Sequence, residues 1–276
     1  MIVGPEISED DTRPRRSVSQ INQYMRCPMA YKLSRIDKAW GRPAAWLPQG
    51  SAVHTVCEHY ELHRLAGNPM SLEEALDLFR TEYAMEVSDY TEETPNFDYW
   101  SWSGPYNGER DVERRYHVGL EQVTKFVEFS QSQVIWIAPD GTPGIELEFK
   151  IDLDGILVRG FIDAIVQGPE GPRVRDYKTG NTPGDDFQLA VYALAVSEVY
   201  GIDKPQQGDY YMAGKKGKKA GPTAPYDLSH WTKEEVSAVF AAVEAKIQAG
   251  EFEPDPEPNK CKFCDVNRAC PTYNGQ

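Results

Sequence analysis

Hydrophobic and polar residues alternate through the middle of the chain with the two-residue period of β-strands. In residues 145–153, apolar side chains occupy every second position and charged side chains occupy most of the positions between them. Asp154-Gly155 follows as a turn, and a second apolar run covers residues 158–166. A Gly/Pro-rich turn then leads into a third run at 173–177. The pattern predicts three consecutive strands, the last two joined by a five-residue connection at 168–172.

Outside this region, apolar residues recur every three or four positions, which is the period of amphipathic helices. Ser17 or Ser19 is a suitable N-cap for the first helix, and Thr232 with Glu235 forms a capping pattern before the last one. One further strand is expected at 206–213. Helices are also expected at residues 50–65, 71–88, 111–130, 186–200 and 232–249.

Two acidic residues and one lysine stand out in the predicted strands. Asp163 lies inside an otherwise apolar run, where a carboxylate is costly to bury unless it is paired or binds a metal. Asp176 and Lys178 are two positions apart, so both side chains project from the same strand face. Carboxylates that share a site repel each other, and hard oxygen ligands suit Mg²⁺ or Mn²⁺. The pattern indicates a metal site where Lys178 orients a water and stabilises charge on a phosphate.

Asp-x-Lys is common by itself and usually marks a solvated strand end. Here it is the middle member of three segments, Gly160-Phe161-Ile162-Asp163, Asp176-Tyr177-Lys178-Thr179-Gly180 and Gln188-Leu189-Ala190-Val191-Tyr192. Together they resemble the PD-(D/E)xK nuclease superfamily, in its RecB-like branch. The resemblance implies that Asp163, Asp176 and the backbone carbonyl of Tyr177 bind the divalent ion. It also implies that Gln188 and Tyr192, four positions apart on one helix face, lie near the DNA backbone.

Histidines offer a further ligand. Gly50-x-x-x-His54 resembles the first motif of the same superfamily, whose histidine binds the metal or lies beside it. A half-buried helix histidine is the competing interpretation. His59 and His63 are spaced for zinc, but no HExxH pattern is present, and a solvated helix face fits better. Glu148 would either lie near the metal or face solvent.

The five cysteines suggest a second metal site. An odd number without a secretion signal argues against a disulfide framework, and Cys261, Cys264 and Cys270 have metal-binding spacing. The string SQINQYMRCPMAYKL, which holds Cys27, resembles the start of RecB-like nucleases with an iron–sulfur cluster. The resemblance implies a structural [4Fe–4S] cluster on these four thiolates, with zinc as the less favoured occupant. Cys57 is expected to be a small core residue.

Charge narrows the choice of partners. The 276 residues carry a net charge of −14, which argues against a general nucleic-acid coat but allows a local basic channel. A lysine-rich loop is a candidate for this channel, and the alternative is a solvated turn. Its residues are Lys215, Lys216, Lys218 and Lys219.

Within the segment 89–110, three aromatic residues fall in the run Tyr99-Trp100-Ser101-Trp102. Trp100 and Trp102 either pack this segment as a loop or stack on bases. No apolar run approaches the roughly 20 residues of a membrane span, and no signal-peptide core is present. A cytoplasmic location without membrane association is therefore expected.

The resemblance implies an α/β fold with a restriction-endonuclease-like core, in which helices flank a mixed central sheet. Residues 1–16 are expected to form a flexible arm, and residues 17–276 a single RecB-like nuclease domain. Within that domain we expect a helical addition at 65–140, the sheet core at 141–213, and an iron–sulfur region in which 259–276 joins Cys27.

The expected function is that of a metal-dependent DNA exonuclease, which hydrolyses phosphodiester bonds at DNA ends or in single strands. It would serve recombination, repair or CRISPR adaptation, with a protein of one of these pathways as a further partner. Two alternatives stay open. One is a non-catalytic DNA-binding or assembly subunit that keeps the fold, and the other is a structural partner stapled by zinc.

Overall fold

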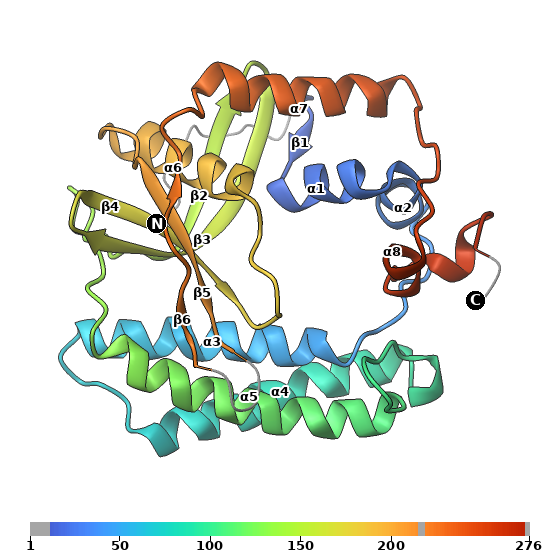
Figure 1. The fold of residues 1–276 in the computed structure, drawn as a ribbon, viewed down its shortest axis with the longest axis horizontal. Helices are drawn as coiled ribbons and strands as arrows, with labels where there is room; N and C mark the ends of the chain where they lie inside the picture. The colour runs from blue at the N-terminus through green and yellow to red at the C-terminus, as the bar shows by residue number, and fades with distance from the viewer. Residues whose placement is uncertain (1–11, 215–218, 274–276) are drawn as a thin grey trace.

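A mixed sheet lies between two layers of helices in this computed structural model, which describes residues 12–214 and 219–273. Figure 1 shows α3, α4 and α5 as one layer beside the sheet, with α6 and α7 on the other side. The strands are β1 (Arg15–Arg16), β2 (Ile145–Leu153), β3 (Ile156–Gly168), β4 (Gly171–Lys178), β5 (Gln207–Met212), β6 (Gly221–Pro222) and β7 (Tyr226–Asp227). The helices are α1 (Val18–Arg26), α2 (Pro28–Tyr31), α3 (Trp46–Leu65), α4 (Leu72–Glu93), α5 (Gly108–Ser130), α6 (Asp186–Tyr200), α7 (Lys233–Gln248) and α8 (Pro258–Lys262). Short helical turns add η1 (Lys32–Ile36), η2 (Phe97–Tyr99) and η3 (Asn267–Ala269).

Strand β3 is the longest strand and has several partners. It pairs antiparallel with β2 from Leu153↔Ile156 to Ile145↔Ala164. On its other edge it pairs with β1 near its start and with β4 over its last residues. β4 and β5 are parallel, because α6 carries the chain back between them. The strand order is β1-β3-β4-β5-β6, with β2 on β3 and β7 on β5.

Both predicted hairpins are present. Asp154 and Gly155 have φ angles of +52° and +91°, so they form the type I′ turn that an Asp-Gly pair favours. The second connection is shorter than the five residues expected, because β3 continues to Gly168 and β4 already begins at Gly171. Gly171 accommodates this tight turn with a φ angle of +112°.

Two apolar clusters form the core. One joins α1, α6 and α7 to the sheet, and the other joins α3, α4 and α5 to its opposite face. α6 is apolar on nearly all sides because the sheet and α7 enclose it, whereas the sequence suggested a single apolar stripe. In the second cluster, a Cβ atom on Gly119 would lie 2.0 Å from the ring of Phe79, so this glycine allows α4 and α5 to approach each other.

Helix boundaries and caps follow the sequence closely. Thr232 and Glu235 form the predicted capping box of α7. α3 begins at Trp46, several residues before the predicted start at Gly50. No helix within residues 12–214 and 219–273 combines the length and the apolarity that crossing a bilayer requires.

The prediction of a flexible arm at residues 1–16 is wrong for the part that the structure describes. Arg15 and Arg16 form β1 and pair in parallel with β3. The guanidinium of Arg16 lies 2.6 Å from a carboxylate oxygen of Glu244 on α7, and Arg13 forms an ion pair with Asp152. The physical reason is the free edge of β3, which β4 does not reach. Residues 1–11 lie outside the described residues.

Candidate active site

The two acids found in the sequence meet where β3 and β4 separate. The strands pair only as far as Ala164↔Arg175. Asp163 and Asp176 occupy the next position in this register, so they face each other at the fork. The backbone N–H of Tyr177 donates a hydrogen bond to Asp163 Oδ2 over 2.6 Å. The fork therefore holds Asp163 in place through the backbone of the neighbouring strand.

Two further residues reach Asp163 from other elements. α3 brings Nδ1 of His54 to 3.6 Å from Asp163 Oδ2. Glu146 on β2 completes a group in which one ligand atom each from His54, Glu146 and Asp163 lies within 4.8 Å of the others. This group adds Glu146, which the sequence prediction did not include, and Asp176, which it did include, is not among the three. Glu148 lies outside this group of ligand atoms.

Sequence reasoning missed Glu146 because the strand alternation slips at this point. Ile145 and Leu147 are two positions apart, yet they pack in opposite core clusters. Ile162 and Ile165 are three apart on β3, yet they pack in the same cluster. Glu146 has a φ angle of +41°, which reverses the pleat and turns its carboxylate toward Asp163, its partner in the register. Alternation alone placed Glu146 on one face with Glu148.

Lys178 and α6 surround Asp176. Lys178 Nζ lies 2.7 Å from Asp176 Oδ2 and 5.3 Å from the ring centre of Tyr210. On α6, the side-chain amide of Gln188 donates to Asp176 Oδ1 over 2.7 Å and to the hydroxyl of Tyr192 over 2.8 Å. Gln188 and Tyr192 share a helix face, as their spacing indicated, and in this structure the Gln188 amide is engaged with Asp176.

The concentration of negative charge shifts several pKa values. Burial and the charge of Asp163 raise the pKa of Glu146 to about 7 and that of Asp176 to about 6. Burial would lower the pKa of His54, but the carboxylate of Asp163 outweighs it and raises this pKa to about 9. Burial likewise acts to raise the pKa of Asp163, and the His54 charge holds it below its usual range. A protein that keeps acids this close has a favourable place for a cation.

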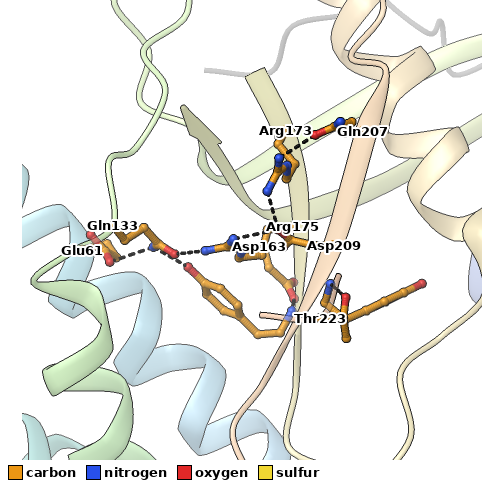
Figure 2. A network of polar contacts seen from close by, with 10 residues as sticks. Glu61, Gln133, Asp163, Arg173, Arg175, Gln207, Asp209 and Thr223 are labelled. Carbon is orange, nitrogen blue, oxygen red and sulfur yellow. Dashed lines mark hydrogen bonds and ion pairs between the residues drawn. The ribbon is translucent and has the colours of Figure 1, made fainter. Parts of the chain in front are cut away.

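A buried polar network supports the fork from behind (Figure 2). Arg175, next to Asp176 on β4, forms a two-point ion pair with Asp209 of β5, with distances of 2.5 and 2.8 Å. Its other end donates to Gln133, whose amide donates to Glu61 of α3 and to the hydroxyl of Tyr177. The network ties β4, β5 and α3 together around the strand that carries Asp176 and Lys178. Sequence reasoning did not identify it, because buried partners lie far apart in the chain.

A groove of about 910 Å³ opens beside the acids. It is lined by α1, by the β2–β3 hairpin, and by Lys178, Gln188 and Tyr192. Three of the predicted site residues, Lys178, Gln188 and Tyr192, thus line a groove whose volume is typical of ligand-binding sites.

The structure also gathers four of the cysteines. Cys27 between α1 and α2 lines one pocket of about 90 Å³ together with Cys261, Cys264 and Cys270. All five cysteines are free thiols, and Cys57 is buried in the core as expected. Burial raises the pKa of Cys264 to about 11. In Figure 1, α8 lies beside α2 at one side of the molecule, so the segment that follows α7 meets the segment around Cys27 there.

Comparison with known proteins decides the family. The sequence matches the PD-(D/E)XK nuclease superfamily over residues 15–271. The chain belongs to the PD-(D/E)XK nuclease superfamily. Asp163 and Asp176-Tyr177-Lys178, on which the resemblance to this superfamily rests, lie together at the fork of β3 and β4. The mixed sheet flanked by helices agrees with the restriction-endonuclease-like fold expected from the sequence.

Two phage proteins are similar to this superfamily member over nearly their whole length. The gene 69 protein of Mycobacterium phage D29 is 62% identical over 262 residues, which covers 94% of this chain and 97% of that protein. The gene 69 protein of Mycobacterium phage L5 is 59% identical over 281 residues, with the same coverage of 94% and 97%. A crystal structure from Eubacterium rectale, provisionally described as an exonuclease, is 15% identical with a TM-score of 0.46, and the match covers 96% of this chain and 94% of that one.

The structure also describes some of the other residues that were predicted to contact DNA. Lys215, Lys216 and Lys218 lie outside the described residues, and Lys219 is exposed on a surface hollow that shares no lining residue with the groove. Trp100 is fully buried and its indole N–H donates to the carbonyl of Thr94, so it cannot stack on a base. The segment 89–110 instead packs against the protein, and this supports the loop interpretation.

Proposed function

We propose that this PD-(D/E)XK superfamily member is a DNA exonuclease that hydrolyses phosphodiester bonds with Mg²⁺ or Mn²⁺. The observation that supports this most strongly is the meeting of Asp163, Asp176 and Lys178 at the fork of β3 and β4. An acid pair with a lysine beside it is the set of groups needed to bind a cation and to stabilise a phosphate. The complete set favours catalysis over a subunit that only binds DNA.

The donor atoms fit a hard divalent cation. His54, Glu146 and Asp163 present an imidazole nitrogen and two carboxylate oxygens within 4.8 Å of one another. Asp176 and the backbone carbonyl of Tyr177 are proposed as further ligands from the opposite strand. The bound ion would polarise the phosphate and lower the pKa of a water molecule.

The protein's own side chains have distinct tasks in this proposal. Lys178 positions the attacking water and stabilises the charge that develops on the phosphate oxygens. Asp176 holds the ammonium of Lys178 at 2.7 Å, and Gln188 fixes the other oxygen of Asp176. The Tyr177 N–H orients Asp163. Such fixed neighbours reduce the reorganisation that the reaction would otherwise require.

The test is hydrolysis of DNA labelled at either end, as single or double strands, with Mn²⁺, Mg²⁺ or EDTA. We expect stepwise release of nucleotides that depends on the metal. Lys178→Ala should reduce the rate by about 10²- to 10⁴-fold, the range for removing a group that acts in the transition state. Lys246→Ala, on an exposed face of α7, is the matched control. Wild-type rates in Lys178→Ala would refute the site, and internal cuts without end dependence would refute the exonuclease assignment.

We further propose that the four cysteines hold a [4Fe–4S] cluster, as in the RecB-like branch of the superfamily. What supports this proposal is that Cys27, from the start of the chain, lines one pocket together with Cys261, Cys264 and Cys270.

Metal analysis of anaerobically purified protein tests the cluster. We expect brown protein that contains iron and sulfide, and loss of the colour in Cys261→Ser. The buried Cys57 provides the control, since Cys57→Ala should keep the colour. A colourless protein that contains zinc would contradict the cluster and favour the zinc-stapled alternative.

The cellular role is also a proposal. The relatives in two mycobacteriophages support a role in recombination or repair of phage DNA over a role in CRISPR adaptation, with a recombination protein as partner. Lys219 and the preceding lysines are proposed as additional phosphate contacts. Gln122 supports this, because its amide donates both to the carbonyl of Gly214 before that loop and to the carbonyl of Thr179 after Lys178.

A further inference from the structure

One aromatic side chain in the groove has no part in the chemistry proposed above. Phe161 keeps 55% of its surface exposed, the largest fraction among the exposed aromatic side chains of the described ranges. It precedes Asp163 by two positions on β3 and lines the same groove as Lys178. Its partner across the hairpin is Glu148, so no apolar residue on β2 covers it. The exposed ring of Phe161 can therefore stack against a flat, apolar part of a ligand that reaches the acid site.

The edge of β3 is open along this part of the groove. β1 pairs with β3 at Leu157 and Val158, and β4 pairs with it only from Ala164 onward. Between these two pairings, this edge of residues 159–163 has no strand partner among the described residues. The opening separates α1 from the end of β4, and both elements contribute lining residues. The groove therefore passes along the strand that carries Phe161 to the acids.

Cations lie along the same groove. Arg159 is exposed and forms no ion pair with any described residue. Arg26 of α1 is exposed as well and forms no ion pair with any described residue. It donates a weak hydrogen bond of 3.4 Å to the carbonyl of Lys260 and also lines the cysteine pocket. The one acid on the lining, Glu148, lies 3.7 Å from Lys150, which offsets its charge. The groove thus offers positive charge in a chain whose net charge is −14.

We propose that this groove binds an unpaired DNA strand, that Phe161 stacks on a nucleobase beside the reacting phosphate, and that Arg26 and Arg159 contact phosphates. The proposal rests on the proposed function and adds the substrate class. Stacking requires a free base face, and in a duplex the neighbouring pairs cover both faces of every base except at the two terminal pairs, whereas a single strand offers free faces along its length. An acidic protein gains little from phosphate contacts alone, so a stacked base is a substantial part of the affinity.

The test is binding of fluorescently labelled single strands and blunt duplexes, measured by anisotropy in EDTA so that no hydrolysis occurs. We expect single strands to bind more tightly than duplexes. Phe161→Ala should weaken single-strand binding by about 5- to 150-fold, the effect of losing one stacked base. Phe161→Trp should retain the affinity, and Phe161→Leu should lose it, because leucine is apolar but cannot stack. Tyr106→Ala, at an exposed aromatic outside the groove, is the matched control.

The arginines give a separate readout. Arg159→Ala should reduce the slope of log affinity against log salt by about 0.7, the value for one phosphate contact on a single strand. Lys246→Ala should leave the slope unchanged. Wild-type single-strand affinity in Phe161→Ala, or equal loss for single strands and duplexes, would overturn the proposal. Binding in EDTA that depends on Phe161, with no hydrolysis in Mn²⁺, would refute the nuclease function and leave the strand site intact.

Discussion

The acid site and the cysteine region differ in what holds their side chains in place. Asp163 and Asp176 are fixed by a backbone N–H, by Lys178 and by Gln188, and the strands that carry them are tied by a buried ion pair. The cysteines instead line a pocket built from short helices and turns. α8 has five residues and none of them is buried.

The difference indicates how each site depends on its metal. The fold itself forms the acid site, so its geometry should persist without a cation. Scattered contacts hold the cysteine segment to the rest of the described chain. The backbone N–H of Arg42 donates to the carbonyl of Asp265, and Arg26 donates weakly to the carbonyl of Lys260. The ring of Phe263 packs edge-on against Trp46, and the guanidinium of Arg268 lies over the ring of Tyr99. Ligation should therefore supply much of the order in the cysteine region, as it does in other small metal-dependent segments.

Removing a cysteine ligand should have the largest effect on stability. A cluster on Cys27 and Cys261 would close a loop of 234 residues (261 − 27). On the scale for cross-links of long loops, its loss costs about 4–5 kcal/mol, or a fall in Tm of about 10 °C. We expect this in Cys27→Ser by anaerobic calorimetry. The folded Cys27→Ser protein should still bind Mn²⁺, because the acid site does not depend on the cysteine region. If Cys27→Ser loses both its stability and its Mn²⁺ binding in the folded state, the two sites are not independent.

Breaking the buried ion pair should have a comparable but smaller effect at the acid site. Arg175→Leu removes the two-point partner of buried Asp209 and leaves it only Arg173, at 3.4 Å, which costs about 3 kcal/mol. Replacing both Arg175 and Asp209 by leucine should recover much of that loss, since no buried carboxylate then remains without its two-point partner. Urea unfolding of the two single variants and the double variant measures this coupling. Simple additivity of the two single effects would show that the pair contributes no specific interaction.

The sequence was informative where local rules decide the structure. The type I′ turn, the capping box of α7 and the motif residues around Asp176 all depend on neighbours in the chain. Glu146 was not predictable, because one positive φ angle reverses the alternation on which the assignment of strand faces rests. No pattern in the sequence marks Arg175, because only the folded chain brings Asp209 and Gln133 to it. The short strand β1 likewise depends on an edge that exists only in the assembled sheet.

The smallest expected effect is the change of Mn²⁺ affinity with pH, which identifies the acids that bind the cation. Glu146 has a pKa of about 7 and Asp176 one of about 6 in the metal-free protein. Both must lose a proton to act as ligands, and so must His54, whose pKa is about 9. Mn²⁺ affinity should therefore rise with pH from about 6 towards about 9, by up to about tenfold per unit for each proton released. Glu146→Gln should remove the part of the rise near pH 7 and weaken binding, while Asp89→Asn on exposed α4 changes neither. A flat profile between pH 5.5 and about 8 would contradict the assignment of these acids as ligands.

Mn²⁺ titration of the wild type and of Asp163→Asn, followed by electron paramagnetic resonance of the free ion, tests the meeting of acids around one cation most directly. We expect wild-type protein to bind Mn²⁺ at the fork, and Asp163→Asn to lose this binding while it keeps its fold. Undiminished Mn²⁺ binding in Asp163→Asn would contradict the account.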